Sequence, residues 1–142
     1  KHVLLDIGPG IAAPTMFFRT AILREIGGFA DDIPLEDVYI KLRLTWCGHK
    51  IGVMNDVLAY YRLHDDNTYK RLEYMLNNVL ASYDRFQESE HYQQARYQYL
   101  NSMLLKASKK DVALARKIFK MIPWSKLDRK AFRSIPRLLT KR

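Results

Sequence analysis

Two adjacent carboxylates, Glu36 and Asp37, are the residues of this sequence that are best placed to do chemistry. They follow Pro34-Leu35 and precede an amphipathic stretch, so they are predicted to lie in the first turn of a helix. The helix dipole and the free backbone amides stabilise a negative charge at that position. A carboxylate presented there at the rim of a cleft can act as a general base. The alternative interpretation is that one of these acids only caps the helix.

A second polar group follows an apolar, strand-like segment that ends at Tyr61. Arg62 and His64 are two residues apart, which in extended backbone places both side chains on one face. Arginine provides fixed donors for phosphate oxygens, and histidine can donate to a phosphate or bind a divalent cation. The alternative is that residues 65–67 form a turn and helix cap, and that His64 is structural. The other histidines have no ligand spacing, so no zinc site is predicted.

The elements that must position these groups lie in residues 1–67, which contain all six glycines of the chain. Thr20 is a candidate N-cap for a helix over 21–26 that ends at Gly27, and a second helix over 36–47 ends at Gly48. Short apolar segments bounded by turn residues are predicted strands, at 3–5, 16–18, 51–53 and 57–61. Alternating strands and helices predict a mixed α/β fold for this part, in a chain that is mostly helical.

Residues 68–142 contain no glycine and read as helices throughout. The helical periodicity predicts helices at about 72–83 and 90–106, a third from Asp111 to before Pro123, and a weaker fourth at 127–139, bent or broken at Pro136. Two consecutive helical hairpins of this kind resemble a tetratricopeptide-like stack. This part could therefore be a protein-interaction module without catalytic activity.

The positive charge of the chain is concentrated at its C-terminal end. Residues 1–108 contain 12 Lys/Arg and 13 Asp/Glu, a net charge of −1, whereas residues 109–142 contain 12 and 2, a net charge of +10. Within 126–142, a short apolar face lies beside basic residues and could make peripheral contact with an anionic membrane; it is formed by Phe132, Ile135, Leu138 and Leu139. The alternative is a terminal helix that packs on its own bundle. No nucleic-acid partner is predicted, because no binding motif accompanies the charge.

Cysteine content and hydropathy indicate the compartment. The single cysteine, Cys47, excludes an internal disulfide and is typical of a reducing environment. No apolar run approaches the ~20 residues that span a bilayer, and no signal-peptide pattern follows Lys1. We therefore expect a cytoplasmic protein, peripheral at the inner face of the plasma membrane if the basic tail contacts lipid.

Six motifs occur in an order that resembles family-two glycosyltransferases of the GT-A type. They are Met16-Phe17-Phe18-Arg19, Ile26-Gly27-Gly28-Phe29, Glu36-Asp37-Val38, Leu42-Arg43-Leu44, Gly48-His49-Lys50-Ile51, and Tyr61-Arg62-Leu63-His64 with Asn67. The resemblance covers residues 10–68 and matches the C-terminal, acceptor-side half of that catalytic domain. It implies that residues 1–67 are this half of a GT-A-type α/β domain, followed by an α-helical tail over 68–142.

The resemblance also implies roles for individual residues. Asp37 matches the catalytic base that deprotonates an acceptor hydroxyl, and Glu36 matches its acidic partner close to the acceptor. Arg62 and His64 match positions near the donor diphosphate and its metal ion, which is Mg²⁺ or Mn²⁺ in the family. The implied reaction moves a sugar from a nucleotide-sugar donor to a saccharide or lipid-linked acceptor with inversion, as in surface polysaccharide or glycolipid synthesis.

The sequence departs from the family pattern in its nucleotide-binding half. The family has an Asp-x-Asp metal motif well before the Glu-Asp pair, but only 36 residues precede Asp37 here. Asp6 follows a strand-like segment and lacks a second acid at the right offset. We therefore expect the chain to be cut from a longer protein, and the isolated chain to have little or no transferase activity.

Overall fold

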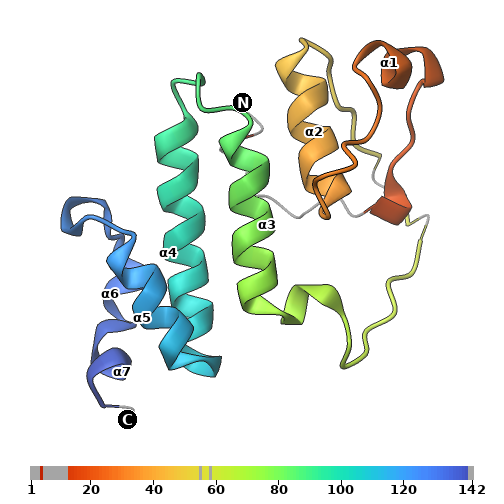
Figure 1. Ribbon diagram of the computed structural model, residues 1–142. Coiled ribbons are helices and arrows are strands. Elements are labelled where there is room, and N and C mark those ends of the chain that lie inside the picture. Colours follow the sequence, from red (N-terminus) through yellow and green to blue (C-terminus); the bar gives the residue numbers. More distant parts are fainter. Residues whose placement is uncertain (1–3, 5–12, 55, 58, 141–142) are drawn as a thin grey trace.

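The computed structural model describes residue 4 and residues 13–54, 56–57 and 59–140 (Figure 1). Within these residues every regular element is helical. The elements are η2 (Ala13–Thr15), α1 (Thr20–Glu25), α2 (Glu36–Trp46), η3 (Thr68–Lys70), α3 (Leu72–Asp84), α4 (Tyr92–Lys110), α5 (Val112–Lys120), η4 (Trp124–Lys126), α6 (Arg129–Phe132) and α7 (Ile135–Thr140), where η marks a 3₁₀ helix. No described helix is long and apolar enough to cross a membrane.

The prediction of a mixed α/β fold, the C-terminal half of a GT-A-type domain, is wrong for the described part of the chain. Residues 16–18, 51–53 and the described part of 57–61 have no regular secondary structure, and 3–5 lies outside the described residues except for Leu4. A strand forms only where a neighbouring backbone satisfies its N–H and C=O groups. No backbone–backbone hydrogen bond joins 51–54 or 59–63 to another described residue. These apolar segments are therefore irregular chain in the structure, not strands of a sheet.

Both short helices of the N-terminal part end in a glycine, as the sequence predicts. Gly27 has φ +86°, its N–H donates to the Arg24 carbonyl (3.1 Å), and the next N–H donates to the Leu23 carbonyl (2.8 Å). Gly48 repeats the arrangement after α2, with φ +85°. This is the Schellman motif, which requires a left-handed residue. The start of α1 differs from the prediction, because Arg19 is the N-cap and Thr20 is the first helical residue.

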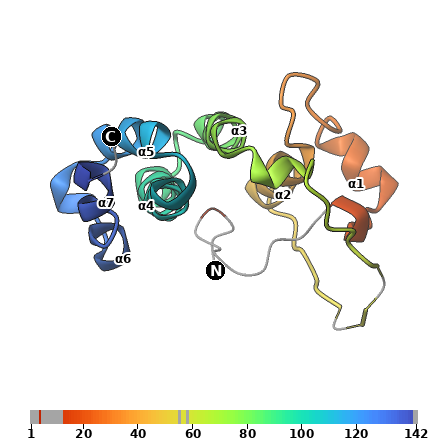
Figure 2. The same cartoon turned by 90° about the horizontal axis from the view of Figure 1, so that it is seen from below.

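Helices α3, α4 and α5 form a bundle (Figures 1 and 2), and the bundle core holds 12 of the 22 buried hydrophobic residues in the described part of the chain. Each helix contributes large apolar residues at helical spacing, and Leu100, Leu104 and Ile118 are completely buried. Asp111 is the N-cap of α5, where its Oδ1 accepts the Leu114 N–H at 2.9 Å. The helices predicted from apolar periodicity in this part are therefore confirmed, with α4 extending beyond the predicted end at 106.

A smaller cluster joins α2 to the bundle. Leu42 of α2 packs with Phe86, which follows α3, and with Ala95 of α4. Ring contacts extend the cluster, because Tyr39 and Trp46 lie 6.0 and 5.5 Å from Phe86, centroid to centroid. The short helix α1 is held in turn by α2, through a 3.4 Å hydrogen bond from Arg43 Nε to the Ile26 carbonyl. The bundle therefore supports the part of the chain that carries the acidic pair.

The predicted helix over 127–139 is two helices, α6 and α7, which pack back on the bundle. The break falls at residues 133–134, and Pro136 lies in the first turn of α7, where proline's missing N–H costs no helical bond. Ala131 and Leu138 are buried in the bundle core. Arg116 Nη2 donates to the Leu138 carbonyl at 2.8 Å. The prediction that Leu138 belongs to an exposed apolar face is therefore wrong, because its side chain is buried in the bundle core, whereas Phe132 and Leu139 of the same predicted face are exposed.

Candidate functional site

Glu36 and Asp37 begin helix α2 but do not cap it. Leu35 is the N-cap residue, with a buried side chain, and no side-chain hydrogen bond caps this end. The N–H groups of Val38 and Tyr39 instead donate to the Leu35 carbonyl, at 3.2 and 3.1 Å. Glu36 is exposed and Asp37 is half-buried, and neither carboxylate forms a hydrogen bond or ion pair with another described residue. Both acids are therefore available to a ligand at the positive end of a helix.

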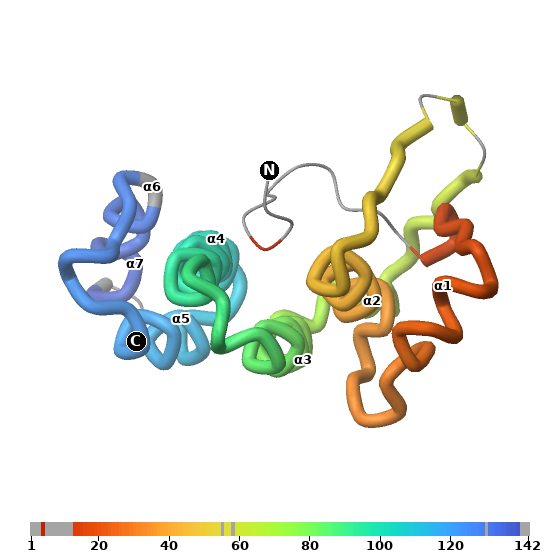
Figure 3. Tube along the Cα trace, turned by 90° about the horizontal axis from the view of Figure 1, so that it is seen from above, coloured from red at the N-terminus to blue at the C-terminus, as the bar shows by residue number. Residues whose placement is uncertain are grey.

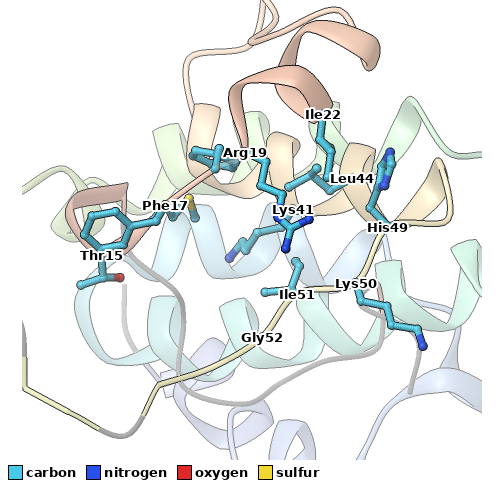
Figure 4. Close-up of a pocket in the computed structure, with 12 residues that line it drawn as sticks. Thr15, Phe17, Arg19, Ile22, Lys41, Leu44, His49, Lys50, Ile51 and Gly52 are labelled. Atoms are coloured by element: carbon cyan, nitrogen blue, oxygen red, sulfur yellow. The ribbon is translucent and has the colours of Figure 1, made fainter.

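A pocket of about 250 Å³ lies beside the same helix (Figure 4). It is formed where the segment leading into α1, the middle of α2 and the segment after α2 meet. Its apolar wall includes Phe17, Ile22 and Leu44. The polar lining is basic and contains no acidic residue, with side chains from Arg19, Lys41, His49 and Lys50.

The basic lining suits an anionic ligand. Arginine and lysine side chains around one concave surface raise the local concentration of anions, and their N–H groups match phosphate or carboxylate oxygens. His49 Nε2 is buried, lies 3.5 Å from Glu25 Oε1, and has no hydrogen-bond partner among the described residues. That separation is longer than a normal hydrogen bond. The histidine ring therefore retains a polar atom that a bound group could satisfy.

The acidic pair and the pocket are linked by the geometry of α2. Asp37 and Lys41 are four residues apart in the helix, so their side chains lie on one face, one turn from each other. Lys41 lines the pocket and Asp37 does not. The arrangement places a carboxylate next to a pocket with a basic lining, which suits a reaction that needs a base beside a negatively charged group.

Arg62 and His64 are exposed, and neither lines this pocket. Asn67, which is 7% exposed, organises their loop. Its Oδ1 accepts the His64 N–H at 2.6 Å, and its Nδ2 donates to the Arg62 carbonyl at 3.3 Å. The predicted turn is therefore confirmed. No contact between described residues joins Arg62 or His64 to the acidic pair, so the structure does not bring the four predicted residues together.

The predicted metal role of His64 lacks a ligand set. No group of three His, Cys, Asp or Glu side chains in the described part of the chain could hold a metal ion. The ring of His64 instead lies beside the Asn67 amide, with Nε2 3.2 Å from Nδ2. The described residues therefore do not fit a divalent-metal site around this histidine.

The basic residues of the pocket were not predicted as site residues. Arg19, His49 and Lys50 belong to motifs that carry the family resemblance, but their types alone do not place them around one cavity. One local feature of the sequence could have indicated a pocket residue: Lys41 follows Asp37 by four residues, which places both on one face of the predicted helix.

Comparison with protein-family models, with curated proteins and with solved structures finds no match to this chain. The resemblance to family-two glycosyltransferases therefore stays a prediction, and any function must be argued from the residues and their geometry.

Proposed function

We propose that residues 13–67 provide the acceptor side of an inverting glycosyltransferase, which moves a sugar from a nucleotide-sugar donor to an acceptor hydroxyl in polysaccharide or glycolipid synthesis. One observation carries the proposal: Glu36 and Asp37 begin α2 without capping it, one turn from a basic pocket. A transferase of this kind needs a base for the acceptor and cations for a diphosphate leaving group. The order of motifs described above supplies the reaction type.

Asp37 is the base in the proposed reaction. Its carboxylate takes the proton of the acceptor hydroxyl as the acceptor oxygen forms a bond to the anomeric carbon. The bond from that carbon to the diphosphate oxygen breaks on the opposite side, so the nucleoside diphosphate leaves with the bonding electrons and the configuration inverts. Glu36, the adjacent exposed acid, is proposed to accept hydrogen bonds from other acceptor hydroxyls. A positioned base contributes about 10²–10⁴-fold to the rate.

The leaving diphosphate requires positive charge. The resemblance assigns this role to Arg62 and His64, and the pocket adds Arg19, Lys41 and Lys50 as candidates. Arginine and lysine stabilise developing negative charge without a change of position when they are held in advance. Mg²⁺ or Mn²⁺ serves this purpose in the family, but the described residues do not fit a metal site, so no step is assigned to a metal ion here.

The decisive test replaces the base and leaves its shape unchanged. Asp37→Asn should lower kcat by about 10²–10⁴-fold in a transfer assay with a panel of nucleotide sugars and saccharide acceptors, with Mg²⁺ or Mn²⁺ added or omitted. Asp31→Asn, a matched change at an exposed loop acid, should leave kcat unchanged. Full turnover by Asp37→Asn would refute the assignment of the base.

A binding measurement covers the case in which the chain alone does not turn over. Inorganic pyrophosphate should bind, and Lys41→Gln should weaken that binding about tenfold, because one close cation is worth ~1–2 kcal/mol at a partly buried site. Asp37→Asn should not weaken it. A chain that neither binds pyrophosphate nor transfers sugar from any donor would contradict the proposal.

The second candidate is a protein-interaction role of the helical part. A groove of about 520 Å³ runs along α4 and η4, with a polar lining that includes Gln93, Gln94 and Gln98. Such a surface can accept a peptide through side-chain amides. This candidate takes precedence if both tests above fail.

A further inference from the structure

The outer surface of α5, α6 and α7 combines strong positive charge with few acidic residues of its own. Every basic side chain described between residues 109 and 137 is exposed. Both acids of this part are engaged as helix N-caps, since Asp111 Oδ1 accepts the Leu114 N–H at 2.9 Å and Asp128 Oδ1 accepts the Ala131 N–H at 2.6 Å. Glu73 of α3 balances one of the cations, because its Oε1 lies 3.0 Å from Lys117 Nζ. Most of the net charge of +10 over 109–142 is left for an anionic partner.

Large apolar side chains are exposed among the basic ones. Trp124 of η4 is 67% exposed, Leu139 of α7 is 79% exposed, and Phe132 of α6 is 47% exposed. Helices α6 and α7 are anchored through other residues, because Ala131 of α6 and Leu138 of α7 occupy the bundle core. The exposed residues therefore remain accessible while α6 and α7 stay packed on the bundle.

Helices α6 and α7 lie at the end of the molecule away from α1 and α2 (Figures 2 and 3). A partner bound to this end would not cover the acidic pair of α2. Binding of a partner at this end is therefore independent of the proposed transferase activity, and either can fail without the other.

We infer that the surface formed by α5, η4, α6 and α7 docks peripherally on an anionic lipid bilayer. Basic side chains pair with lipid headgroups, and the Trp124, Phe132 and Leu139 side chains enter the interface between headgroups and acyl chains. Tryptophan and phenylalanine prefer that interface, and each basic residue near an anionic leaflet strengthens binding about fivefold, or ~1 kcal/mol. A nucleic acid would match the charge, but it gives no reason for an exposed leucine.

Vesicle sedimentation with the full chain tests the inference. The chain should bind phosphatidylcholine vesicles that contain about 30% phosphatidylserine at ~0.05 M salt, bind less at ~0.5 M salt, and not bind pure phosphatidylcholine. Arg129→Gln with Arg133→Gln, four residues apart in the chain, should weaken binding roughly 25-fold. Arg24→Gln with Arg71→Gln removes the same charge outside this surface and should leave binding unchanged within about twofold.

Insertion of the apolar residues is tested separately. Trp124→Ser with Leu139→Ser should weaken vesicle binding and leave the binding of a DNA duplex unchanged. In a Trp46→Phe background, which leaves Trp124 as the one tryptophan, the emission should shift to shorter wavelength on anionic vesicles.

Three results would overturn the inference: no binding to anionic vesicles at low salt, an equal loss of binding in the control pair, or an unshifted Trp124 emission together with tight duplex binding. The emission measurement needs no serine variant, so it decides even if Trp124→Ser with Leu139→Ser does not fold.

Discussion

Asn101 holds the segment that leads into α6 on the bundle, so its substitution should destabilise the chain. It is 3% exposed and lies in the middle of α4. Its Nδ2 donates to the Lys126 carbonyl at 2.9 Å, and its Oδ1 accepts the Asp128 N–H at 3.1 Å. One amide therefore satisfies two backbone groups of the segment that leads into α6.

Asn101→Ala should lower the free energy of unfolding by about 2 kcal/mol, because two hydrogen bonds are lost at ~1 kcal/mol each. Nδ2 also donates to the Tyr97 carbonyl, but that carbonyl lies inside α4 and keeps its helical bond, so this loss adds little. For a chain of this length, 2 kcal/mol corresponds to a decrease in Tm of roughly 6–8 °C.

Urea denaturation followed by circular dichroism measures the change. Asn77→Ala, the same substitution at an exposed position of α3, should alter the free energy of unfolding by less than about 0.5 kcal/mol. If Asn101→Ala is no more destabilising than Asn77→Ala, the two backbone groups find other partners and the proposed role of Asn101 is refuted.

Two further predictions concern the bundle and the end of α2. Burial, and to a smaller extent the neighbouring Tyr83, raises the pKa of Tyr99, whose hydroxyl donates to the Met75 carbonyl at 3.0 Å. The native state therefore keeps this proton above the ordinary value of 10.0, where the unfolded chain releases it, so the free energy of unfolding should fall as pH rises above 10. The slope of the free energy of unfolding against pH approaches ~1.4 kcal/mol per pH unit for each such group. Chemical denaturation from pH 8 to 11 should therefore show a shallower decline of this free energy for Tyr99→Phe than for the unchanged chain. Gly48→Ala should destabilise the chain by ~1 kcal/mol, because φ is +85° there; an unchanged thermal midpoint would show that the α2 terminus rearranges without strain.

The parts of the structure that follow from local sequence were predicted well. Gly27 and Gly48 end their helices and Asp111 begins one, because each signal acts through the backbone of its own turn. Even so, the break in the last helix falls before Pro136, since proline is as acceptable in a first turn as it is disruptive in the middle of a helix.

Features that depend on distant residues were not predicted. The apolar segment 57–61 has the composition of a strand, yet strand formation requires a partner backbone, which composition does not report. The basic pocket likewise joins Arg19, Lys41 and Lys50 from three segments, and only packing of α1 on α2 brings them together. The acidic pair was predicted at the start of α2, but the finding that Leu35 is the N-cap needed the structure.

The contact of Leu42 with Phe86 and Ala95 has a consequence for the order in which the protein folds during synthesis. Helix α2 leaves the ribosome about 50 residues before Ala95, which at ~5–20 residues per second is roughly 2–10 s earlier. During that interval the inner face of α2 lacks the partners that later bury it. The α2 segment therefore exposes apolar side chains to chaperones on the nascent chain, and α2 reaches its final packing only after the first half of α4 has been made.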